Sequence, residues 1–234
     1  MRVLTTLAVL LAGVLAMRSA FAAEPVRRIA IYVQPYYQSA QTPDVPPRVS
    51  VGRTYDDLLA SMKKEDIIKA RDMIETDPRA VTPMTMMVLA IRLYDMGLRD
   101  DAVFWFYAAK ARYITLEDVI DVRISGLTAP GEAVKNFAVL AGPVINGYAF
   151  CDRIKQHAAN IKAIEWAEQH PYVVLFMSQL TGKDGDRRAN LKKSIDEQKA
   201  AAERERARFD DPKFAEEFAA TRRKNEADVK FCWK

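Results

Sequence analysis

Residues 82–113 read TPMTMMVLAIRLYDMGLRDDAVFWFYAAKARY, and this stretch decides the fold. Thr82 is a good helix N-cap, and Pro83 suits the first helical position, where its missing N–H leaves no hydrogen bond unmade. Apolar residues then recur every three to four positions until Gly97, which favours the left-handed conformation that ends a helix. Two aspartates after the turn complement the positive end of a second helix. The stretch therefore predicts a helical hairpin.

Helical patterns also lie on both sides of this hairpin. The apolar spacing predicts one helix from Thr54 that stops at Asp77 and Pro78. The run 172–180 is apolar and too short for periodicity to separate a helix from a strand. We therefore expect an all-α protein of stacked helical hairpins with a long charged helix near the C-terminus. Further helices are expected at residues 115–118, 132–140, 145–156, 158–169 and 187–208, and from Asp211-Pro212 onward.

The charged segment 187–208 consists almost entirely of Arg, Lys, Glu, Gln and Ala, with Leu191 and Ile195 as its large apolar residues. Such a helix has high intrinsic propensity and a thin apolar stripe. The pattern favours a helix that lies along the protein surface. The alternative, half of a coiled coil, would need three or more clean heptads.

The N-terminus has the pattern of a cleavable secretory signal peptide, residues 1–22. Arg2 precedes an apolar run over residues 3–17, and Ala20-Phe21-Ala22 is a small-x-small cleavage pattern. A membrane anchor is the alternative, but about 15 apolar residues fall short of the roughly 20 that span a bilayer. We therefore expect a mature chain that starts at Ala23, lacks a transmembrane segment and works in the periplasm or outside the cell.

Composition divides the expected mature chain into three parts. These are an extended arm or linker at 23–53, a helical domain at 54–182, and charged C-terminal helices at 183–234. Within the arm, residues 28–33 form a short β-rich run. Removing the signal peptide lowers the formal net charge from +4 to +2. So small a charge gives no indication of nucleic acid binding, and export also disfavours that partner.

The two cysteines, Cys151 and Cys232, agree with export, because an even pair in an oxidising compartment is usually a disulfide. Closing a loop of this length would stabilise the fold by roughly 4 kcal/mol in the chain-entropy model. The alternative is a pair of buried free thiols. We expect the disulfide to hold the apolar tail around Phe231 and Trp233 against the body of the protein.

A pattern of small and aromatic residues recurs in the hairpin at a familiar spacing: Ala90, Gly97, Ala102, Phe106 and Ala109. On these residues, segment 83–114 resembles a single tetratricopeptide or Sel1-type repeat. Small side chains let the two helices approach, and the aromatic ring fills the space further along. The resemblance implies a TPR-like helical stack whose function is to bind another protein.

Two sets of hairpin residues are candidates for a binding surface. The second apolar face of the first helix would line the concave surface of a repeat protein: Met84, Met87, Ile91 and Tyr94. The alternative is that other helices of this chain cover that face. The hairpin tip also carries a charged cluster, which is either a recognition site or ordinary helix capping: Asp95, Arg99, Asp100 and Asp101.

The sequence carries little that indicates catalysis. His157 and His170 have no metal-ligand spacing, and no glycine-rich phosphate loop is present, so we expect neither a metal nor a cofactor. Glu165 and Glu168 share one helix face, which is ordinarily a solvated acidic face. The alternative is a periplasmic cell-wall hydrolase in which one of these glutamates is the acid.

The sequence therefore predicts an exported protein of the bacterial envelope that is not an enzyme and acts by binding a partner protein. A role as a toxin-neutralising immunity protein and a role as an adaptor in envelope assembly are both consistent with this expectation.

Overall fold

The structure of the protein is a computed structural model that describes residues 23–29, 37–38, 48–49 and 54–233. The predicted signal peptide, residues 1–22, and residues 30–33 of the β-rich run lie outside the described residues. The fold is all-α, with one two-residue antiparallel strand pair, β1 (Tyr37–Gln38) and β2 (Arg48–Val49). The helices are α1 (Asp56–Ala60), α2 (Lys64–Thr76), α3 (Pro83–Asp95), α4 (Arg99–Val119), α5 (Thr128–Ala149), α6 (Arg153–Gln169), α7 (Arg187–Arg208), α8 (Pro212–Lys224) and α9 (Ala227–Phe231), and the 3-10 turns are η1 (Pro78–Ala80) and η2 (Val173–Phe176).

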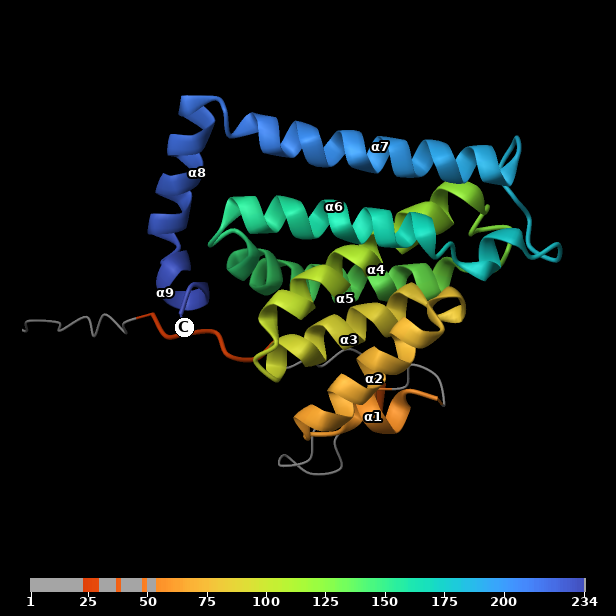
Figure 1. The fold of residues 1–234 in the computed structure, drawn as a ribbon, viewed down its shortest axis with the longest axis horizontal. Helices are drawn as coiled ribbons and strands as arrows, with labels where there is room; N and C mark the ends of the chain where they lie inside the picture. Colours follow the sequence, from red (N-terminus) through yellow and green to blue (C-terminus); the bar gives the residue numbers. More distant parts are fainter. Residues whose placement is uncertain (1–22, 30–36, 39–47, 50–53, 234) are drawn as a thin grey trace, which may run out of the picture.

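Helix α4 is the centre of the molecule. It packs against α3, α5, α6 and α7, so it is surrounded by helices on nearly every side (Figure 1). Large and small apolar residues alternate along it, from Trp105 and Phe106 to Ala108 and Ala109, and all four are buried. The alanines let neighbouring helix backbones approach closely, while the rings fill the wider gaps. None of the helices among the described residues is long and apolar enough to cross a membrane.

The predicted hairpin is confirmed as α3 and α4. The Thr82 hydroxyl accepts a hydrogen bond from the Thr85 backbone N–H at 3.0 Å, as a helix N-cap does. Gly97 closes α3 with a φ of 78°, a conformation that glycine adopts without strain. Ala90 and Ala102 are fully buried between the two helices, as the close approach requires.

Three predicted helix boundaries were wrong. The helix expected from Thr54 to Asp77 is broken into α1 and α2, because Ser61 is extended and the Arg92 guanidinium donates to its carbonyl oxygen at 2.7 Å. The predicted start at Thr115 is an interior position of α4. Its hydroxyl donates to the Arg112 carbonyl at 2.8 Å within that helix instead of capping a new one.

The third boundary error is at Pro143, where the sequence predicted a helix end and α5 continues to Ala149. A proline inside a helix removes the hydrogen bond to the carbonyl four residues earlier, here that of Val139. Val139 is 73% exposed and Pro143 is exposed too, so this turn of α5 lies on the solvent side of the helix. The next helix, α6, begins after the Asp152 cap, so the break predicted between helices 145–156 and 158–169 lies at residues 150–152 instead, while the predicted end at Gln169 is confirmed.

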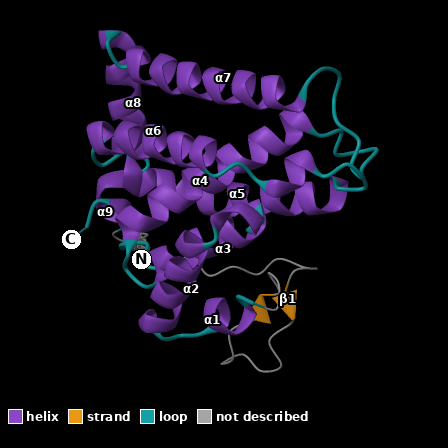
Figure 2. Cartoon of the chain, turned by 45° about the vertical axis from the view of Figure 1, so that its right-hand side comes forward, coloured by secondary structure: helices purple, strands orange, loops and turns teal. Residues whose placement is uncertain are grey.

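The charged segment 187–208 forms α7 and lies along the surface, as predicted. Ile195 and Ala202 are buried against Ala111 of α4 and Ile164 of α6, and Figure 2 shows α7 beside α6 along one edge of the molecule. A thin apolar stripe is enough here because one side of α7 meets the protein and the other meets solvent. The ambiguous run 172–180 forms the 3-10 turn η2 and not a strand.

The disulfide between Cys151 and Cys232 is present, with the two Cα atoms 5.6 Å apart. It joins the connection between α5 and α6 to the residue that follows α9. The apolar tail is therefore held against the body, as the sequence predicted.

Arg112 is a buried cation that forms no ion pair with a carboxylate of the described residues. Its guanidinium donates to the carbonyl oxygens of Pro78 at 2.6 Å, Val81 at 2.8 Å and His170 at 2.7 Å, and lies 4.8 Å from the centre of the Trp166 ring. Burial lowers the pKa of Arg112 to about 10. The side chain thus connects the loops that precede α3 and follow α6 to the central helix.

We expect Arg112→Met to lower the free energy of unfolding by about 3 kcal/mol, because methionine fills much of the space but removes the guanidinium donor from three carbonyls, of which, among the described residues, only that of Pro78 keeps a second donor, the Val81 N–H at 3.3 Å. Urea denaturation followed by circular dichroism measures the change. Arg123→Met, at an exposed position, is the control and should stay within about 0.5 kcal/mol of the wild type. A loss below about 1 kcal/mol for Arg112→Met would contradict this role.

Candidate binding groove

An apolar groove of about 400 Å³ lies at the base of the hairpin. Four segments form it: the start of α3, the second half of α4, the first turns of α5, and the residues around η2. This volume lies within the roughly 300–1,000 Å³ of ordinary ligand pockets. The lining residues are mostly apolar: Thr82, Pro83, Met84, Tyr113, Leu116, Leu127, Pro130, Gly131, Val134, Tyr172 and Val174.

The floor of the groove depends on close packing between α4 and α5. A Cβ atom at Gly131 would lie 2.9 Å from the Tyr113 hydroxyl oxygen, so only glycine lets the tyrosine side chain lie this close to α5. Leu116 and Tyr172 are each 8% exposed and Val134 is 4% exposed, so the floor is largely shielded. Met84 is half-buried at the edge and presents a flexible apolar side chain.

Charged groups stand at one lip of the groove. The Tyr113 hydroxyl donates to the Glu117 carboxylate at 2.6 Å, and the Lys135 ammonium lies 3.2 Å from the same carboxylate. Burial, followed by the bond to Glu117, raises the pKa of Tyr113 to about 12, so this hydroxyl remains a donor at ordinary pH. An apolar floor beside a polar rim is the arrangement found in protein–protein interfaces.

The predicted second face of α3 lies mostly in the core. Met87, Ile91 and Tyr94 are 1% exposed or less, so helices of the same chain cover them. This is the alternative that the sequence left open. Met84, one helical turn earlier, is the member of that set that reaches the groove.

The charged residues at the hairpin tip contact other parts of the same chain. Asp95 accepts a hydrogen bond from the Ile29 backbone N–H at 2.8 Å, and Asp101 forms an ion pair with Arg71 at 2.7 Å. Asp100 accepts from the Tyr148 hydroxyl at 2.6 Å. Burial raises the pKa of Asp95, while the Ile29 N–H and Arg92 act in the opposite direction.

Arg99, the fourth member of this tip cluster, holds the C-terminal tail. It donates to the Trp233 carbonyl at 2.8 Å, and its guanidinium lies 3.8 Å from the centre of the Trp233 ring. In the structure the tip therefore receives both the N-terminal segment and the C-terminal tail.

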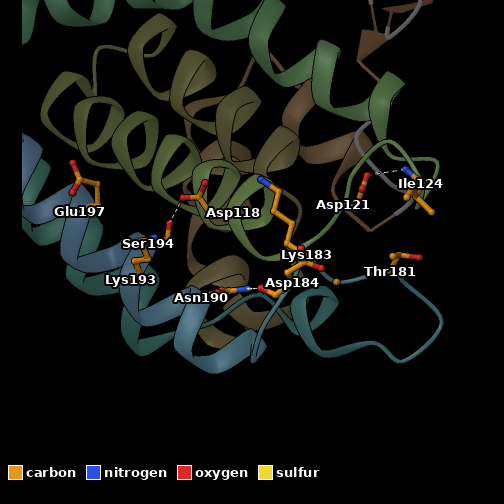
Figure 3. A pocket seen from close by; sticks show the side chains of 11 residues that line it. Asp118, Asp121, Ile124, Thr181, Lys183, Asp184, Asn190, Lys193, Ser194 and Glu197 are labelled. Carbon is orange, nitrogen blue, oxygen red and sulfur yellow. Dashed lines mark hydrogen bonds between the residues drawn. The ribbon is translucent and has the colours of Figure 1, made fainter.

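A second hollow, of about 660 Å³, is polar and lies between the end of α4 and the start of α7 (Figure 3). Lys183 extends into it between Asp118 and Asp121. Asp118 accepts a hydrogen bond from the Ser194 hydroxyl at 2.7 Å, and Asp121 accepts one from the Ile124 backbone N–H at 2.9 Å. Because Asp118 ties α4 to α7 and Asp121 stabilises its own turn through the Arg123 and Ile124 N–H groups, we assign these carboxylates a structural role.

The glutamates of the hydrolase alternative lie on the surface. Glu165 and Glu168 are both exposed, Glu168 pairs with Lys199 at 2.6 Å, and neither lines one of the hollows described here. His157 lies 3.0 Å from Glu203, while the His170 ring contacts Trp166. Within residues 23–29 and 54–233, no three His, Cys, Asp or Glu side chains gather as a metal ion would require.

The comparisons with known proteins identify one family. A protein of Haemophilus influenzae, recorded as "Uncharacterized protein", is 36% identical over 219 residues, which cover 92% of this chain and 83% of that protein. The chain belongs to the same family as this protein. No protein-family model matches the chain, and no solved structure is similar to it.

Sequence reasoning missed most of the groove because its walls come from distant segments. Leu127, Pro130 and Val134 read as the apolar face of a helix, and Tyr172 and Val174 belong to a run without periodicity. One local signal was available. Gly131 lies in the first turn of α5, where a glycine has no helix-ending role, and such a residue indicates close packing.

We expect the neutral dye Nile red to bind the groove and Met84→Gln to weaken its binding roughly three- to tenfold, because part of an apolar contact of about 1.5–3 kcal/mol is lost. Val139→Gln removes an apolar side chain that is 73% exposed and lies outside the groove, and should leave binding unchanged. Fluorescence titration measures both. Equal effects of the two substitutions would show that the dye binds elsewhere.

Proposed function

We propose that the protein is an exported binding module of the bacterial envelope, and that its apolar groove holds an apolar segment of a partner protein. The observation that carries this proposal is the groove itself, an open apolar hollow with a charged lip at the base of the hairpin. Apolar side chains of a partner would lose contact with water there, and polar groups of its backbone would meet Glu117 and Lys135 at the edge.

Two further features support a binding role over a catalytic one. The charged side chains around the polar hollow and at the hairpin tip bind other parts of the same chain. The acids proposed for hydrolysis, Glu165 and Glu168, stand on an open surface, and Glu168 pairs with Lys199, so neither lies in a cleft that would enclose a substrate. A toxin and an envelope component can each supply such an apolar segment.

Export is part of the same proposal. The chain from Ala23 onward contacts the body: the Val26 backbone N–H donates to the Lys230 carbonyl at 2.8 Å, and the Val26 carbonyl accepts from the Tyr94 hydroxyl at 2.9 Å. Cleavage after Ala22 would leave these contacts intact. An oxidising compartment also suits the disulfide.

The groove is tested by placing a photoreactive residue at Leu127 and illuminating living cells. We expect one discrete crosslinked species, which is lost when Met84→Asp is added, because a charge in the apolar groove excludes the partner. Val139→Asp introduces the same charge at an exposed position outside the groove, and should leave the crosslink in place. Absence of any crosslink, or its equal loss in both variants, would refute the groove as the binding site.

Export is tested separately by cell fractionation and N-terminal sequencing of the tagless protein. We expect the periplasmic or secreted fraction to contain a chain that begins at Ala23. A full-length chain that starts at Met1 in the cytosol, with both cysteines reduced, would contradict the proposal.

A further inference from the structure

The C-terminal tail, which consists of α9 with Cys232 and Trp233, lies over the hairpin tip. Arg99 donates to the carbonyls of Phe231 at 3.4 Å and Trp233 at 2.8 Å, and its guanidinium lies between the rings of Trp233 and Tyr148, at 3.8 and 4.5 Å from their centres. The Phe231 ring covers Gly147, where a Cβ atom would lie 2.6 Å from the ring. The tail therefore packs closely against Arg99, Tyr148 and Gly147.

The tail also holds the N-terminal segment. The Lys230 carbonyl accepts a hydrogen bond from the Val26 backbone N–H, and the Arg27 guanidinium lies 4.8 Å from the centre of the Trp233 ring. Both ends of the expected mature chain thus meet at the hairpin tip, and the N-terminal segment loses these two contacts whenever the tail leaves.

Helix α8, which connects α7 to the C-terminal tail, packs loosely against the body of the protein. The helix stands at one end of the molecule (Figure 1), and none of its residues is buried. Its contacts with the body include Phe218 against Phe150, with ring centres 5.4 Å apart, and a hydrogen bond from Arg222 to the Gly147 carbonyl at 3.3 Å. The tail therefore depends strongly on the covalent bond between Cys151 and Cys232. Cys151 is exposed, so a reductant can reach its sulfur.

Two opposite charges flank the disulfide. The Arg222 guanidinium lies 3.1 Å from the Cys232 sulfur and 3.7 Å from the Cys151 sulfur, while the Asp228 carboxylate lies 3.5 Å from the Cys232 sulfur. Arg222 and Asp228 also pair with each other at 2.8 Å. A cation stabilises a thiolate and a carboxylate destabilises it, so the two residues have opposite effects on cleavage of the bond.

We propose that Cys151–Cys232 is a reducible latch, which a dithiol opens to free the tail and uncover Arg99 and Tyr148 at the hairpin tip. The reductant is a dithiol, either a small molecule or the exposed cysteine pair of a thiol–disulfide oxidoreductase. In the oxidised protein the tail covers these tip residues, and in the reduced protein they face solvent.

The reaction is a thiol–disulfide exchange. A thiolate of the dithiol attacks the exposed Cys151 sulfur, the bond to Cys232 breaks, and its electron pair leaves on Cys232 beside Arg222. The second thiol of the reductant then attacks the mixed disulfide and releases Cys151. The reductant leaves as a disulfide, and its two protons reside on the two protein thiols, so the two electrons gained by the protein equal those lost by the dithiol.

The charge effect is tested by the rate of reduction with dithiothreitol, followed by alkylation and mass spectrometry of the full chain. We expect Arg222→Gln to slow reduction roughly threefold or more, and Asp228→Asn to accelerate it by a similar factor, because a better-stabilised thiolate leaves faster. Arg223→Gln, at the exposed neighbouring position, is the matched control and should not change the rate. If the residues only held the tail in place, both substitutions would accelerate reduction, and that result would overturn the proposal.

Opening of the latch is tested by hydrogen exchange of the oxidised and reduced wild-type protein. We expect reduction to lower the protection of residues 26–29 and 227–233, while the amides of α3 and α4 stay protected. The Cys151→Ser variant should match the reduced protein without any reductant. Unchanged protection of the tail after reduction, or in this variant, would show that non-covalent contacts alone hold it and would overturn the latch.

Discussion

The burial of α4 on nearly all sides is the constraint on which the rest of the structure depends. A helix that contacts α3, α5, α6 and α7 needs small residues where backbones approach and rings where they diverge, and the alternation of Ala108 and Ala109 with Trp105 and Phe106 meets both needs. Helix α3 is itself buried on both faces, whereas the outer helix α7 has only one face to bury. This explains how α7 can remain in place with Ile195 as its single large buried side chain.

The two ends of α4 differ in their surroundings. At its N-terminal end the hairpin tip is occupied by segment 23–29 and the C-terminal tail, through Asp95 and Arg99. Towards its C-terminal end α3 begins, α5 begins and η2 passes by, and within the described part of the chain no large side chain fills the space between them. The apolar groove is the result, because three elements that converge on one helix from different directions cannot fill every gap.

Covalent and polar ties compensate for segments that bury little. Arg112 connects two loops to α4 through three carbonyls, and the disulfide connects the lightly packed α8 and α9 to the body. Each of these connections rests on one side chain or one covalent bond, so a single chemical change affects a whole segment. The packed helices instead rely on many weak contacts. This difference explains how the fold combines a fixed core with a tail that a single reaction releases.

The sequence by itself determined the all-α class, the α3–α4 hairpin, the surface position of α7 and the pairing of Cys151 with Cys232, because local spacing and composition dictate them. The continuity of α5 through Pro143 came from the tertiary structure, in which this turn of the helix faces solvent. The groove likewise joins residues as distant as Met84 and Val174. The roles of Arg99 and Asp95 were also beyond the sequence, because capping charges and charges that bind distant segments have the same local pattern.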